Sequence, residues 1–156
     1  MSSDQYGSEA PAVEDFLAEY CAASAARDFD TMMKAVAQDA VLVSPLSGRA
    51  VFRGHDDLRI LLTAIYSALS DVSWEAPIGT GDRRVVLGHA KIGPVRLTDA
   101  MIVDLDVDGR IRRFAPHLRP WLALTLVAVR LFPALLRHPA VLRRSMQTPD
   151  PAVWSD

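Results

Sequence analysis

Residues 84–107 read RVVLGHAKIGPVRLTDAMIVDLDV, and this stretch decides the fold. Gly93-Pro94 divides it into two runs in which the character of the side chains alternates, and this pattern is typical of two β-strands joined by a tight turn. A two-residue turn at this point places Gly88 opposite Asp99. Paired residues of antiparallel strands share a face of the sheet. The stretch therefore predicts a β-hairpin with one apolar face.

Asp99 is the one polar residue expected on that face of the second strand. The other residues at odd positions are all apolar: Val95, Leu97, Met101, Val103, Leu105 and Val107. An apolar environment disfavours the charged carboxylate, which raises its pKa toward the range useful for proton transfer. Asp99 is thus the candidate acid–base residue, and Gly88 is expected to leave open space beside it. In one alternative, Asp99 forms a hydrogen bond with a buried Arg or Tyr and has only a structural role. In another, a β-bulge turns its side chain outward.

The rest of the chain predicts one α+β domain, with helices first and an antiparallel meander after them. The expected helices span 13–26 and 55–69, with a short one between them whose apolar stripe is Met32, Met33, Val36 and Ala37. Besides the hairpin, strands are expected over 40–44, 72–78 and 110–118. The expected division is a tail over 1–11, the domain over 12–120, a C-terminal helical extension over 121–146 and a second tail over 147–156.

Composition and charge exclude several classes of protein. Half of the 156 residues are apolar and 23% are charged, which argues against disorder, and the single Cys21 excludes a disulfide scaffold or a Cys-based zinc site. Residues 109–149 hold eight arginines and no Asp or Glu. No aromatic platform accompanies them, so nucleic acid is not an expected partner, and the arginines are expected to complement an acidic face elsewhere in the fold or in a dimer partner. The N-terminus shows no signal-peptide pattern, and a cytoplasmic location is expected.

Several motifs are incomplete. Residues 104–109 match the first half of a calcium loop, but Ala115 stands where a bidentate Glu is required. The four histidines lack the spacing of metal ligands, so no metal site is predicted. Nucleotide-binding and serine-hydrolase fingerprints are also missing, and no cofactor is expected.

The order of elements resembles the nuclear transport factor 2-like superfamily, which includes SnoaL-like polyketide cyclases, ketosteroid isomerases and limonene-epoxide hydrolases. The resemblance spans about residues 12–120. It is carried by Arg27-Asp-Phe-Asp30 after the first helix, Ser44-Pro45 after the first strand, Phe52-Arg53-Gly54 before the third helix and Asp108-Gly-Arg-Ile111 in the meander. It implies a curved sheet wrapped on helices into a cone, with a deep apolar pocket and frequent dimers.

Only some of the catalytic residues of the ketosteroid isomerases have a counterpart in this chain under the resemblance. Tyr20 matches the isomerase tyrosine that stabilises the oxyanion, whereas Ser44 stands at the position of the general base. Met101 stands at the position of the second oxyanion acid, two residues after Asp99. Cyclase-like members often place an acid on the last strand, where this chain offers His117. The expected pocket contains Tyr20 and Asp99 as catalytic residues and Leu42, Ser44, Trp74, Met101, Phe114 and His117 as substrate-binding residues.

These residues suggest a cofactor-independent isomerase, cyclase, dehydratase or epoxide hydrolase that acts on an apolar steroid-, terpenoid- or polyketide-like ligand. In such an enzyme Asp99 moves the proton, Tyr20 donates a hydrogen bond and Ser44 orients the ligand. The alternative is a ligand-binding or accessory protein without catalysis, because Ser44 and Met101 replace the carboxylates of the isomerases.

Residues 121–129 are apolar on all sides of a helix. Arg119 and Arg130 bracket only ten residues, whereas a spanning helix needs about 20, so no integral membrane segment is predicted. Residues 119–137 are expected to be buried partly over the pocket mouth and partly in a homodimer interface. The alternatives are a lid on the chain's own sheet and peripheral attachment to a membrane.

Overall fold

The predicted hairpin forms the longest strand pair of the sheet. In the computed structural model, which describes residues 15–147, β4 (Arg83–Ile92) and β5 (Val95–Leu105) are joined by a two-residue turn. Gly88 lies opposite Asp99, which confirms the predicted register. Their alternating burial places the apolar side chains of both strands on one face, toward the helices.

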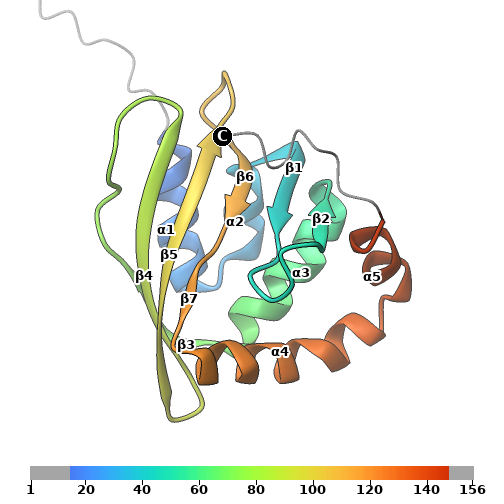
Figure 1. Cartoon of the computed structure of the whole chain (residues 1–156). Coiled ribbons are helices and arrows are strands. Elements are labelled where there is room, and N and C mark those ends of the chain that lie inside the picture. Colours follow the sequence, from blue (N-terminus) through green and yellow to red (C-terminus); the bar gives the residue numbers. More distant parts are fainter. Residues whose placement is uncertain (1–14, 148–156) are drawn as a thin grey trace, which may run out of the picture.

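The described residues form one curved, open sheet of seven strands (Figure 1). The other strands are β1 (Val36–Val43), β2 (Val51–Arg53), β3 (Ser70–Trp74), β6 (Ile111–Ala115) and β7 (Leu118–Arg119). Their order is β2-β1-β6-β5-β4-β3, and β7 pairs with β5. β1 runs parallel to β6, so the sheet is not the purely antiparallel meander that was expected. This parallel pair brings the segment before the third helix against the last strands of the domain.

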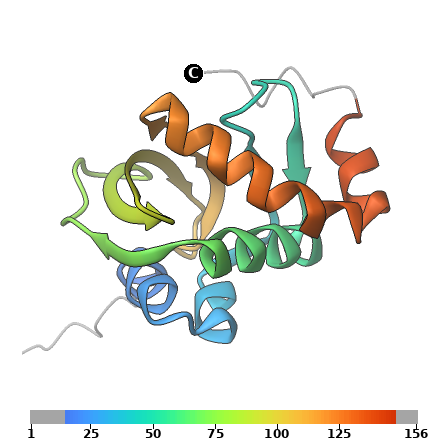
Figure 2. The same ribbon diagram turned by 90° about the horizontal axis from the view of Figure 1, so that it is seen from below.

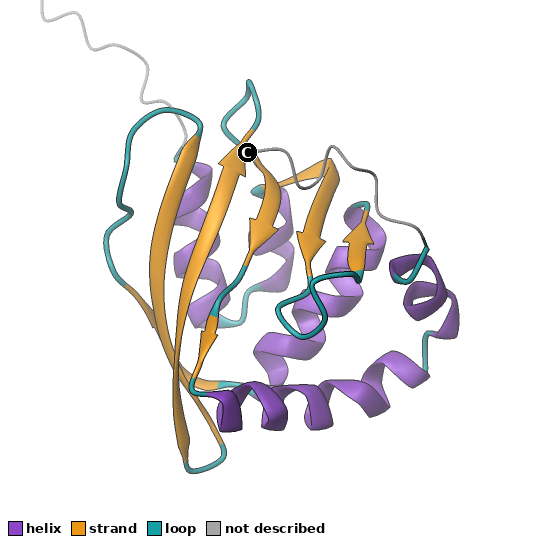
Figure 3. Ribbon diagram, in the orientation of Figure 1, coloured by secondary structure: helices purple, strands orange, loops and turns teal. Residues whose placement is uncertain are grey.

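Five helices accompany the sheet in the described part of the chain (Figure 3). They are α1 (Phe16–Ala26), α2 (Phe29–Lys34), α3 (His55–Ala68), α4 (Trp121–Leu136) and α5 (Pro139–Ser145). Asp15 and Asp28 begin the first two helices, since each carboxylate accepts the backbone N–H three residues later. Arg27 ends α1 in the left-handed region, with φ of 58°.

Three predicted boundaries are wrong for identifiable reasons. Val36 and Ala37 belong to β1 and not to the second helix, because Val36 pairs with Ile111 of β6. The strand predicted over 72–78 ends at Trp74, and Ile78 forms only an isolated bridge with Val85. The strand predicted over 110–118 is interrupted between β6 and β7, where Pro116 has no N–H to donate to the ladder.

The sheet curves around the helices to form a cone, and α4 crosses its open end (Figure 2). The buried core lies between the concave face of the sheet and α1, α2 and α3, and the buried sides of α4 and α5 belong to it as well. No helix of residues 15–147 is long and apolar enough to cross a membrane. The predicted tails lie outside the described residues, apart from Gln147.

Candidate functional site

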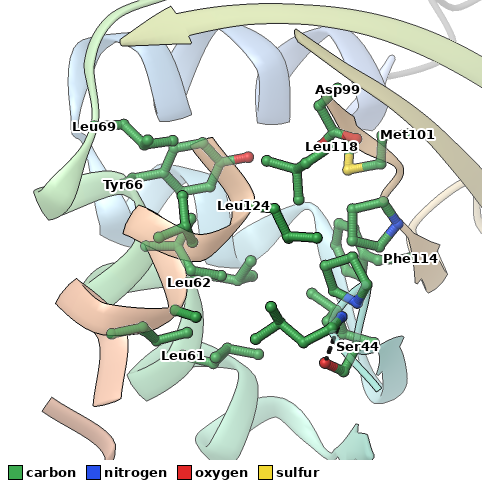
Figure 4. Close-up of a pocket in the computed structure, with 18 of the residues that line it drawn as sticks. Ser44, Leu61, Leu62, Tyr66, Leu69, Asp99, Met101, Phe114, Leu118 and Leu124 are labelled. Carbon is green, nitrogen blue, oxygen red and sulfur yellow. Dashed lines mark hydrogen bonds between the residues drawn. The ribbon is translucent and has the colours of Figure 1, made fainter. Parts of the chain in front are cut away.

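A cavity of about 290 Å³ lies between the concave face of the sheet, α3 and α4 (Figure 4). Its wall is almost entirely apolar, and α3 and α4 supply residues such as Leu62 and Leu131. Seven of the eight predicted site residues line it: Tyr20, Leu42, Ser44, Trp74, Asp99, Met101 and Phe114. The structure therefore brings together residues from α1, β1, β3, β5 and β6 that are up to 94 positions apart in sequence.

Asp99 is the acidic residue of this wall. It points into the cavity from β5, beside Met101 and Leu118 (Figure 4). Burial raises the pKa of its carboxyl from 3.8 to about 6, and a hydrogen bond from the backbone N–H of His117 (2.8 Å to Oδ1) partly opposes the rise. At pH 7 the carboxylate is mostly ionised, yet it is a much stronger base than an exposed aspartate.

The break between β6 and β7 provides that hydrogen bond. Pro116 and His117 leave the ladder, so the N–H of His117 is free to donate to Asp99, while its carbonyl accepts from the N–H of Ala100 at 3.2 Å. The imidazole of His117 is exposed, and its Nδ1 lies 3.0 Å from the carbonyl oxygen of Ala115. His117 is not among the residues that line the cavity; its ring is exposed, and it contributes its backbone N–H to Asp99.

Tyr20 of α1 and Tyr66 of α3 form a hydrogen-bonded pair, with 3.0 Å between their hydroxyl oxygens. Burial raises the pKa of both phenols, and the negative charge of Asp99 raises both further. Both hydroxyls therefore remain protonated donors at neutral pH. One of the two hydroxyl protons is used within the pair, and the hydroxyl of Ser24 is a further hydrogen-bonding neighbour of Tyr66.

Tyr66 is the member of the pair that sequence analysis missed as a site residue. Its ring enters the cavity with the hydroxyl directed toward Leu118 and Asp99 (Figure 4), whereas Tyr20 has no exposed surface. The sequence places Tyr66 only in the apolar stripe of the third helix. Its contact with Tyr20 depends on how α1 and α3 pack, which no local pattern encodes.

Trp74 occupies the space that was expected to be open beside Asp99. A Cβ at Gly88 would lie 2.6 Å from Cζ3 of Trp74, so the indole ring lies directly over the glycine backbone. The indole Nε1–H donates to Oγ of Ser24 at 2.9 Å, and that hydroxyl donates to the carbonyl of Cys21. Gly88 thus provides room for the ring of Trp74, and both residues line the cavity.

Ser44 lies at the far end of the cavity from Asp99 (Figure 4). Its Oγ accepts the N–H of Leu46 at 3.2 Å, and its own N–H donates to the carbonyl of Ala50, so it holds the loop between β1 and β2. A single ligand group therefore cannot contact both Ser44 and Asp99. Of the two, only Asp99 lies at the tyrosine end.

The rejected calcium loop is a hairpin turn built on carboxylate contacts. Asp106 accepts the backbone N–H groups of Asp108 and Arg110, and Asp104 forms ion pairs with Arg83 and Arg113 on the outer face of the sheet. Within residues 15–147, no group of three His, Cys, Asp or Glu side chains is placed to hold a metal ion.

The comparisons with known proteins agree with this architecture. The sequence profile described as the SnoaL-like domain matches residues 17–114. The chain belongs to the SnoaL-like family. No curated protein matches its sequence. Helices α4 and α5 lie beyond the matched residues, although α4 forms one wall of the cavity.

Solved structures share the fold of this SnoaL-like protein at low sequence identity. A protein with a cystatin-like fold from Silicibacter pomeroyi DSS-3 superposes with a TM-score of 0.76 at 17% identity, covering 83% of this chain and 93% of the other. A steroid delta-isomerase from Pseudomonas aeruginosa gives 0.71 at 24% identity, covering 80% and 92%. A SnoaL-like protein from Burkholderia thailandensis E264 gives 0.56 at 18% identity, covering 69% and 95%. These likenesses show the fold of the chain, a cystatin-like cone.

Proposed function

We propose that this SnoaL-like protein is an acid–base enzyme that shifts a proton on a compact apolar ligand carrying a carbonyl group. The observation that carries the proposal is the position of Asp99: a carboxylate with a pKa of about 6, at the same end of an apolar cavity as a pair of buried phenols. Groups with strongly shifted pKa values in a cavity are candidates for catalysis. The residues alone can supply acid–base chemistry, so the proposed enzyme uses no cofactor.

The proposed reaction has two proton transfers. The carboxylate of Asp99 takes a proton from the carbon next to the ligand carbonyl, and the electron pair of that C–H bond moves into an enolate. The Tyr20–Tyr66 pair donates a hydrogen bond to the enolate oxygen, where negative charge develops. Asp99 then returns the proton to a carbon of the same ligand, which gives an isomer and restores the carboxylate.

The size of the cavity limits the ligand. A volume of about 290 Å³ is at the low end of the roughly 300–1,000 Å³ typical of ligand pockets. Because the wall offers few polar groups, a ligand with one polar end and an otherwise apolar body fits it best. Large multi-ring polyketides are less suited to this space than compact cyclic terpenoid-like ketones.

The proposal is tested by exchange of carbon-bound hydrogen in D₂O. Compact β,γ-unsaturated cyclic ketones are the probes, and NMR follows the loss of their α-proton signals. The protein is expected to catalyse exchange, and Asp99→Asn is expected to reduce the rate by about 10²–10⁴. Asp82→Asn, which changes an exposed carboxylate in the β3–β4 turn, is the matched control and should keep the full rate.

A specific observation also favours a second function, that of a non-catalytic carrier. Ser44 and Met101 stand where the resemblance to the isomerases expects carboxylates, and Ser44 is engaged in holding a loop. Tight binding of the same ketones without exchange, equal in the native chain and in Asp99→Asn, would support the carrier and reject the enzyme.

A further inference from the structure

Helix α4 has two apolar faces, and only one of them is covered. Ala123, Val127, Leu131 and Leu135 are buried against the body of the protein. On the opposite side the exposed apolar residues are Trp121, Leu122, Val129, Phe132 and Leu136, each 44–76% exposed, and Phe132 at the border of this face also lines the cavity. Thr125 lies among them, and its hydroxyl donates to the carbonyl of Trp121, so its polar group is satisfied inside the helix.

Arginines border this uncovered face. Arg130 and Arg137 are exposed in α4 and at its end, and Arg119 and Arg143 are exposed just before α4 and within α5. Other arginines of the C-terminal half have partners: Arg113 pairs with Asp104 and Arg144 with Asp57. Among residues 15–147, none of the four bordering arginines forms an ion pair.

We propose that the outer face of α4 docks on an anionic phospholipid surface, with α4 lying flat in the headgroup region. Trp121 and Phe132 would enter the boundary between headgroups and acyl chains, where aromatic side chains are enriched. Arg130 and Arg137 would contact lipid phosphates and carboxylates, each adding attraction at a negatively charged surface.

Charge favours this occupant over a second copy of the chain. A twofold contact through α4 would bring the arginines of both copies together, and residues 109–149 contain no Asp or Glu to pair with them. An anionic bilayer supplies both the apolar phase and the opposite charge. The homodimer expected from the sequence is therefore the competing outcome of the test.

Docking would also place the cavity next to the bilayer. The inner side of α4 contributes Leu124, Val127 and Leu131 to the wall of the cavity, and Phe132 at the border of the outer face lines it as well, so α4 lies between the cavity and the proposed lipid surface. An apolar ligand dissolved in the membrane could then enter without crossing water. The docking surface itself does not depend on whether Asp99 is catalytic.

Co-sedimentation with vesicles tests the proposal on the full chain. Vesicles of phosphatidylcholine alone are compared with vesicles containing about 30% phosphatidylserine, at low and at high salt. We expect binding to the anionic vesicles only, weakened by salt because surface attraction is screened. Arg130→Gln/Arg137→Gln is expected to weaken binding about 30-fold, and Trp121→Ser/Phe132→Ser is expected to abolish it.

Matched controls lie at the other end of the sheet. Val107 is fully exposed in the β5–β6 turn, so Val107→Ser removes an apolar group without touching α4, and Arg84→Gln/Arg112→Gln removes two arginines from the strands near that turn. Both controls and Asp99→Asn should bind as the native chain does.

Two results would overturn the proposal. One is the absence of binding to anionic vesicles at low salt. The other is a dimeric mass in light scattering that Trp121→Ser/Phe132→Ser converts to a monomer, which would assign the face to a second copy. Thermal unfolding of each variant shows that loss of binding does not result from loss of the fold.

Discussion

Tyr66 and Tyr20 are chemically alike, but their positions give them different roles. Both tyrosines line the cavity, but Tyr66 keeps a small exposed surface, whereas Tyr20 has none and packs against Phe114 at 5.3 Å between ring centroids. Tyr66 is therefore the direct donor to the proposed oxyanion, and Tyr20 positions it and supports it through the 3.0 Å hydrogen bond.

This difference predicts unequal effects of removing the two hydroxyls. Tyr66→Phe is expected to lower the rate of ketone exchange by about 10²–10³, the usual cost of losing one oxyanion donor. Tyr20→Phe is expected to cost less, because Tyr66 keeps its own proton. The exchange rates of the two variants, measured with one probe ketone, check this order. An equal or larger loss in Tyr20→Phe would assign the direct contact to Tyr20.

The sequence predicts the orientation of the Asp99 side chain, but it does not predict the groups that surround the carboxylate. Alternation along β5 and the two-residue turn are local features, and they place Asp99 inward and opposite Gly88 without knowledge of the fold. The hydrogen bond from His117 depends on the break at Pro116, and the ring of Trp74 over Gly88 depends on how β3 pairs. These are tertiary contacts, which sequence periodicity does not contain.

At the scale of elements, Gly88 couples β4 to Trp74 of β3. In Gly88→Ala the added Cβ would clash with the indole ring of Trp74. The ring must then move away, which breaks the hydrogen bond from its Nε1–H to Ser24. We expect a loss of about 1–3 kcal/mol in the free energy of unfolding, typical of overpacking. Chemical denaturation measures it. His89→Gln, which changes the adjacent exposed residue and keeps a side-chain donor for Glu75, serves as the control. Equal stability in both variants would contradict the contact between Gly88 and Trp74.

Helix α5 is held to α3 by one ion pair. Arg144 donates two hydrogen bonds, of 2.9 and 2.7 Å, to the carboxylate of Asp57, which is largely buried. Arg144→Gln would leave that carboxylate without its cation. Hydrogen exchange of amides in α5 is expected to accelerate, and exchange in α4 to accelerate less. Arg143→Gln, at the adjacent exposed position, is the control and should leave the exchange rates unchanged. If the amides of α5 stay protected in both variants, the ion pair between Arg144 and Asp57 does not hold α5 in place.

Sequence periodicity predicts most elements, because α1, α3, β4 and β5 each bury one regular stripe. It does not predict the position of α4, since a helix that is apolar on all sides has no preferred face. The structure shows that one side walls the cavity, as the predicted burial over the pocket mouth requires. Burial of the other side in a homodimer stays a prediction.

At the scale of the whole molecule, Asp99 links global stability to pH. The carboxyl of Asp99 has a pKa of about 6 in the folded state and near 3.8 in the unfolded state, so the folded state binds the proton more tightly. Protonation of Asp99 therefore stabilises the folded protein. This stabilisation of the folded state is fully present below pH 3.8 and is lost as the pH rises through 6. The free energy of unfolding, relative to that of Asp99→Asn, is expected to fall by about 2 kcal/mol from pH 4 to pH 7.

Denaturation of both proteins across that pH range measures the difference directly. Asn at position 99 keeps an oxygen that can accept the N–H of His117, so the comparison isolates the charge. A difference that is constant with pH, or that rises toward pH 7, would show that the carboxylate is not destabilised by its surroundings.

The most direct test of the account is the titration of Asp99 itself. The carboxyl ¹³C signals of the ¹³C-labelled protein are followed by NMR from pH 3 to pH 8, and the signal of Asp99 is assigned by its disappearance in Asp99→Asn. We predict a midpoint near pH 6, well above that of exposed aspartates. A midpoint at or below pH 4 would contradict a buried acid–base group and the function proposed from it.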